Sequence, residues 1–214
     1  MKIALIILFT LLSIPRTIGQ EKLDLRSDEL ITKTFSEIEI EGLESMVRYV
    51  DNMVSKGKKE PNINNAYHIF FEKIAQSTVY NVPFKETEKY QFLKSLDSVQ
   101  FPAVWVFRTN IDMLSLRDTV YRHLENFPQL DINPYGKYID YLEEVGKEDS
   151  YFYGIHKTFK NIHNISARDV SWFPRNHSIF DFTIPKNRLW AVIFILRMEE
   201  TYEMKLDRYL NTKK

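Results

Sequence analysis

Residues 189–196 read Leu-Trp-Ala-Val-Ile-Phe-Ile-Leu, an unbroken run of eight apolar side chains. A helix that is apolar on every side is a buried helix, and eight residues are far too few to cross a bilayer. Thr183 and Pro185 stand at the expected helix start, as a capping residue and a first-turn proline. Beyond the run, apolar residues recur on one face as far as Tyr209. The sequence therefore predicts one long C-terminal helix at the centre of the core.

Amphipathic helices are predicted over most of the preceding chain, because apolar residues recur at steps of three and four. The first is the longest and covers about Ser27 to Lys56, with Gly42 as the place for a kink or a break. Further helices are expected at about 64–76, 86–97, 110–127, 133–146 and 150–164.

A short apolar run at 103–107 fits either a strand or the start of a buried helix, since periodicity alone does not separate the two. Only six glycines occur in 214 residues, which argues against a sheet with many tight turns. The predicted fold is mainly α, a single-domain bundle of about six to seven helices with a long C-terminal core helix.

The N-terminus has the layout of a secretory signal peptide. Lys2 precedes an apolar segment, Ile3 to Leu12, that is too short to span a bilayer, and Thr17-Ile18-Gly19 supplies small residues before a cleavage point. We expect residues 1–19 to be removed and residues 20–214 to form one helical domain, secreted or periplasmic and of bacterial type.

Composition excludes several classes of partner and chemistry. The chain carries 29 basic and 29 acidic side chains with no basic cluster, so neither nucleic-acid binding nor a polybasic membrane anchor is expected. It has no cysteine, which removes thiolate nucleophiles and cysteine-held metal centres. No phosphate-binding loop, nucleophile elbow or zinc-protease motif occurs. We expect no cofactor and no stable membrane anchor after signal cleavage.

Acidic and histidine residues offer two weak metal patterns. His68 and Glu72 lie one helical turn apart, and we interpret them as a surface pair rather than as metal ligands. Glu199, Glu200 and Glu203 are expected to form an exposed, salt-bridged helix face with their basic neighbours.

Residues 165–184 lack a helical period, and long irregular stretches in compact domains are usually functional or disordered. The segment is too rich in aromatic residues for disorder. A short β-hairpin near 169–184 is expected, with Phe180, Phe182 and Ile184 on one face of its second arm.

This segment also mixes donors, acceptors and aromatic rings, which is typical of a ligand pocket. The predicted ligand-binding residues are Arg168, Asp169, Trp172, Arg175, His177 and Asp181. Trp105 and Arg108, beside the run at 103–107, are a secondary candidate. The simpler alternative is an irregular connection held by its aromatic residues, with the charges in water.

Two classes of function follow. The favoured one is an exported helical binding protein that presents residues 165–184 to a protein or small-molecule ligand. The alternative is a periplasmic or secreted hydrolase that uses Asp169, His177 and Asp181 for general acid–base chemistry. Binding is favoured because no spacing in the sequence demands catalysis, and no residue is assigned a catalytic role.

Overall fold

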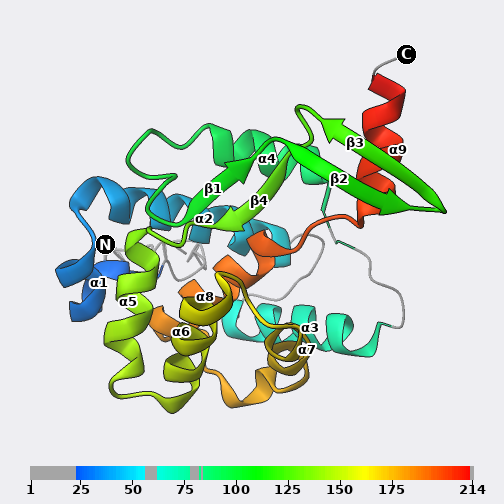
Figure 1. Cartoon of the computed structure of the whole chain (residues 1–214). Helices are drawn as coiled ribbons and strands as arrows, with labels where there is room; N and C mark the ends of the chain where they lie inside the picture. The colour runs from blue at the N-terminus through cyan, green and yellow to red at the C-terminus, as the bar shows by residue number, and fades with distance from the viewer. Residues whose placement is uncertain (1–22, 56–61, 78–81, 83, 213–214) are drawn as a thin grey trace, which may run out of the picture.

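The computed structural model describes residues 23–55, 62–77, 82 and 84–212 (Figure 1). The predicted signal peptide at 1–19 lies outside these residues. The described part is mainly α, as predicted, with two small antiparallel pairs of strands. Within it, no helix has the length and apolar character needed to cross a membrane.

The predicted long first helix is wrong, because the chain divides it. A short 3-10 turn, η1 (Leu25–Ser27), leads into α1 (Glu29–Thr34) and then α2 (Glu37–Ser55). Ser36 starts α2 with a capping box, in which the Glu39 carboxylate accepts from the Ser36 backbone N–H at 2.7 Å. Gly42 does not break α2. A Cβ there would lie 2.7 Å from Cβ of Gln100, so the glycine permits a close approach.

Helices α3 (Ile63–Gln76) and α4 (Glu86–Lys94) follow near the expected places. The helix predicted for 110–127 is wrong, because the chain forms a β-ribbon. Strand β1 (Trp105–Arg108) pairs with β4 (Gln129–Ile132), and β2 (Ile111–Leu116) pairs with β3 (Thr119–Leu124). The run at 103–107 thus contributes to a strand.

A two-residue turn closes the β2–β3 hairpin. Arg117 and Asp118 both have positive φ, 52° and 60°, as a type I′ hairpin turn requires. Such turns are usually Asn-Gly, Asp-Gly or Gly-Gly, and the pair Arg117-Asp118 matches none of these.

Three further helices lie on the side of α8 that faces away from the strands (Figure 1). They are α5 (Lys137–Gly146), α6 (Ser150–Ile162) and α7 (Ala167–Arg175). The hairpin predicted near 169–184 is wrong, since α7 and the 3-10 turn η2 (His177–Ile179) occupy this segment. Ser166 caps α7, its hydroxyl accepting from the Asp169 N–H at 3.1 Å.

The C-terminal helix is not continuous. Helix α8 (Pro185–Arg197) ends at an extended Met198, and α9 (Tyr202–Thr212) starts in a new direction (Figure 1). Ile184 rather than Thr183 is the N-cap of α8. All eight side chains of 189–196 are buried, and α8 contacts both α2 and β4.

A second, smaller apolar cluster joins the β-ribbon to α9. It is built on Leu124, Phe127 and Leu206. The Arg117 guanidinium adds a bidentate contact to the Asp207 carboxylate, at 2.9 and 3.0 Å. The ribbon and α9 therefore lie side by side (Figure 1).

Candidate functional site

A pocket of about 310 Å³ lies between α6 and α7. We call it the α6–α7 pocket. Helix α6 and Ser166, the N-cap of α7, supply hydroxyl groups to its wall, while α7 supplies a ring and two charges. Its lining includes Ser150, Tyr151, Gly154, Thr158, Arg168, Asp169 and Trp172. Three of the six predicted ligand-binding residues are thus brought together here.

Trp172 forms the aromatic wall of the pocket. The indole is half-buried and stacks on Tyr151, with ring centroids 5.1 Å apart and planes 27° from parallel. Tyr151 is itself held in place, because Trp190 Nε1 donates to its hydroxyl at 3.0 Å. Burial raises the pKa of Tyr151, so the hydroxyl keeps its hydrogen and can donate it.

Two opposite charges stand on the first turn of α7. One Asp169 carboxylate oxygen accepts from the Ser166 hydroxyl at 2.5 Å, and no described residue donates a hydrogen bond to the other oxygen. Arg168 is exposed and forms no ion pair with any described residue. The pocket therefore offers a donor and an acceptor beside the Trp172 ring.

Gly154 is an unusual residue for the middle of α6. A glycine inside a helix costs roughly 0.5–1 kcal/mol relative to alanine. The structure gives no packing reason for it, since a Cβ added at Gly154 would meet no atom within 4 Å. Because Gly154 lines the pocket, that missing side chain leaves open space within it.

The other three predicted residues lie beyond the pocket, toward the C-terminal end of α7. Arg175 is exposed on the last turn of that helix. His177 Nδ1 lies 3.0 Å from His68 Nδ1 of α3, and one Asp181 oxygen accepts from both the N–H and the hydroxyl of Thr183. In the described part of the chain, no contact joins Asp169, His177 and Asp181, the three groups that a hydrolase would need together.

The His68–His177 contact also replaces the predicted His68–Glu72 pair, since Glu72 accepts from Gln76 instead. A hydrogen bond between two imidazole nitrogens requires that one of them be unprotonated. Burial and the neighbouring His177 lower the pKa of His68, with Asp181 acting in the opposite direction. Among the residues that the structure describes, no group of three or more metal-ligating side chains occurs.

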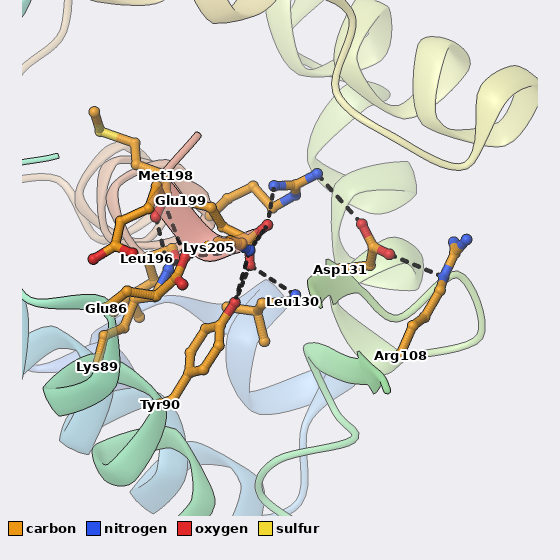
Figure 2. A network of polar contacts seen from close by, with 12 residues as sticks. Glu86, Lys89, Tyr90, Arg108, Leu130, Asp131, Leu196, Met198, Glu199 and Lys205 are labelled. Carbon is orange, nitrogen blue, oxygen red and sulfur yellow. Dashed lines mark hydrogen bonds and ion pairs between the residues drawn. The ribbon is translucent and has the colours of Figure 1, made fainter. Parts of the chain in front are cut away.

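The acidic residues near 200 form a partly buried network rather than the predicted exposed helix face (Figure 2). We call it the ionic chain, because its members alternate in charge. In order of contact they are Arg108, Asp131, Arg197, Glu199, Lys205, Glu86, Arg208 and Glu200. Glu203 lies outside this chain, on the exposed side of α9, where it approaches Arg117.

Glu199 is the centre of the ionic chain (Figure 2). Burial would raise its pKa, but Lys205, the Tyr90 hydroxyl and the Leu130 N–H outweigh that effect and lower it. Lys89 lies beside the chain and donates to the carbonyls of Leu196 and Met198, at 3.0 and 2.6 Å. These are C-terminal carbonyls of α8, so Lys89 caps that helix where the chain turns toward α9.

Sequence reasoning missed the α6 side of the pocket, because Tyr151 and its neighbours were assigned to an ordinary amphipathic helix. The only signal available was Gly154, a costly residue in a helical pattern. Comparison with protein-family models, with curated proteins and with solved structures found no match to this chain.

Proposed function

We propose that this protein is an exported binding protein and that the α6–α7 pocket holds a small neutral sugar. The observation that carries the proposal is the position of the Trp172 ring, stacked on Tyr151, beside Arg168 and Asp169 in one pocket. A sugar ring has C–H groups on one face and hydroxyls around its edge. It therefore needs an aromatic surface together with donors and acceptors, and this pocket supplies both.

The size of the pocket agrees with a small ligand. Its volume of about 310 Å³ lies at the lower end of the range for ligand sites. Ser150 and Thr158 add hydroxyl groups that both donate and accept. Gly154 keeps the wall between them free of a side chain, at a cost in helix stability that ligand binding would explain.

A thermal-shift screen of the purified protein against neutral mono- and disaccharides tests the proposal. A ligand at 100 times its dissociation constant stabilises the folded state by about 2.7 kcal/mol, which such a screen detects. We expect the shift to disappear in Trp172→Ala and to shrink in Arg168→Ala. Tyr135→Ala is the matched control, because Tyr135 is 93% exposed and lies outside the pocket lining.

Gly154→Ala is a variant in which a loss of binding cannot be attributed to a loss of folding. The added methyl group enters open space, so the fold is kept while the pocket becomes narrower. A sugar that binds Gly154→Ala and Arg168→Ala as tightly as the wild type would exclude the α6–α7 pocket as its site. The absence of a shift with every sugar would exclude the ligand class.

The exported state is a separate part of the proposal and rests on residues 1–19. We expect the mature protein to begin at Gln20 and to be recovered from the periplasm or the medium. N-terminal sequencing of protein purified from fractionated cells tests it, and an intact Met1 in the cytoplasmic fraction would contradict it.

A further inference from the structure

A second pocket, of about 250 Å³, is lined by residues of α3, α7 and α8. We call it the α3–α8 pocket. Its walls are mostly apolar, formed by Ile74, Ile165, Val170, Phe194 and Met198. Its polar lining residues are Arg197, at the end of α8, and Asn164.

Arg197 makes the longest ion-pair contact in the ionic chain. Its guanidinium lies 3.3 Å from an Asp131 oxygen and 3.7 Å from a Glu199 oxygen, and Nη2 also donates to Asn164 Oδ1 at 3.3 Å. The exposed Arg117, in contrast, holds Asp207 at 2.9 and 3.0 Å. Nε of Arg197 is buried and has no hydrogen-bond partner among the described residues. A buried donor without an acceptor is costly, so Arg197 would gain a hydrogen bond if its guanidinium turned and Nε met a ligand oxygen.

The two acids that face Arg197 have closer partners. Asp131 is held by Arg108 at 2.9 Å, and Glu199 is held by Lys205 at 3.0 Å (Figure 2). If the Arg197 guanidinium turned toward an anion in the pocket, neither acid would be left without a counter-charge. The positive charge of Arg197 is therefore available to a ligand at small cost.

We infer that the α3–α8 pocket binds an apolar carboxylate, with the alkyl chain on the apolar walls and the carboxylate on Arg197. Arginine suits this role because its planar donors match a carboxylate. The size follows from volume. A cavity of about 150 Å³ holds benzene, so 250 Å³ corresponds to about ten non-hydrogen atoms, as in octanoate. This inference is independent of the proposed sugar site.

Isothermal titration of the purified protein with octanoate, octan-1-ol and octylamine tests the inference. The three share an alkyl chain and differ in charge. We expect one octanoate per chain, bound at least about tenfold more tightly than octan-1-ol, with no binding of octylamine, since charge-assisted hydrogen bonds supply the difference.

Variants then locate the site. Val170 is 44% exposed, so Val170→Phe should fill the pocket without disturbing the core and should abolish octanoate binding. Val120→Phe is the matched control, because Val120 is 50% exposed on β3, outside the pocket, and it should bind as the wild type does. Arg197→Gln keeps polar donors and removes the charge, so octanoate should weaken to the level of octan-1-ol.

Three outcomes would overturn the inference. Octanoate does not bind at millimolar concentration, octan-1-ol binds equally well, or Val170→Phe binds octanoate as the wild type does. Should Arg197→Gln fail to fold, Val170→Phe and the octan-1-ol comparison still decide. Trp172→Ala should leave octanoate binding unchanged, which separates this site from the α6–α7 pocket.

Discussion

Arg188 of α8 and Asp51 of α2 form a doubly hydrogen-bonded ion pair inside the apolar core. Arg188 Nε donates to Asp51 Oδ1 at 3.0 Å, and Nη2 donates to Oδ2. The arginine side chain is 2% exposed, and the Tyr67 hydroxyl adds a hydrogen bond to the same carboxylate at 2.8 Å. Helix α8 is thus joined to α2 by charge as well as by apolar packing.

Removing one partner should be far more harmful than the pair's net contribution suggests. Asp51→Ala leaves the Arg188 charge buried without compensation, so we expect the free energy of unfolding to fall by about 3–5 kcal/mol in urea denaturation. Asp207→Ala, which breaks the exposed pair with Arg117, is the control and should have a much smaller effect. Equal losses in the two variants would show that burial of the Arg188–Asp51 pair has no special consequence.

Lys89 should make the free energy of unfolding depend on pH in the alkaline range. Burial lowers its pKa from 10.5 to about 8 in the folded protein, against the attraction of Glu199. Between these values the unfolded chain binds a proton that the folded chain does not, so stability rises with pH. We expect a contribution of about 2 kcal/mol between about pH 8 and pH 9.5.

Urea denaturation across that pH range measures the effect, with Lys89→Met as the comparison. Its curve should lack the rise, although the variant is less stable at every pH because two α8 carbonyls lose their donor. The same rise in both proteins would assign it to another group.

Two helical glycines should respond to alanine with opposite signs. Gly154→Ala should raise the free energy of unfolding by roughly 0.5–1 kcal/mol, since the methyl group meets nothing and the helix loses a flexible residue. Gly42→Ala should lower it by roughly 1–3 kcal/mol, because its Cβ would lie 2.7 Å from Cβ of Gln100. Paired chemical denaturation curves check both, and a stabilised Gly42→Ala would mean that α2 and the 97–104 segment separate at little cost.

The His68–His177 contact should weaken in acid. The pKa of His68 is lowered in the folded protein, first by burial and then by His177. As pH falls below the ordinary histidine value, the unfolded chain therefore takes up a proton before the folded one, and stability is lost. We expect the melting temperature to fall less between pH 7 and pH 5.5 in His68→Gln than in the wild type.

His163→Asn is the control for that comparison. The His163 side chain is exposed, and its backbone has the left-handed conformation, which asparagine tolerates. This variant should therefore fold normally and keep the wild-type acid sensitivity. An unchanged fall in His68→Gln would place the acid sensitivity elsewhere.

The sequence pattern predicted the structure correctly where the buried residues lie within a single helix. The apolar run at 189–196 predicted burial from every side, and all eight side chains are buried. The three- and four-residue steps placed α3, α5 and α6 within a few residues. Arg168, Asp169 and Trp172 line one pocket, and ligand binding there stays a prediction.

The error in the predicted first helix could have been avoided from the sequence, because a capping signature marks the start of α2. Ser36-x-x-Glu39 is a helix-start signature inside the predicted first helix, and the apolar period continued across it. The break after α1 was therefore predictable from local residues. It was not predicted because the apolar period continues across the break.

The remaining differences arise from contacts between residues far apart in the chain, which no periodicity records. The turn between α8 and α9 depends on Lys89, more than a hundred positions earlier, and the position of the β2–β3 hairpin beside α9 depends on the Arg117–Asp207 pair. In the α6–α7 pocket, Tyr151 of one helix stacks on Trp172 of another. Composition and apolar periodicity thus determine which residues are buried. Long-range hydrogen bonds and packing determine where helices end and which side chains come into contact.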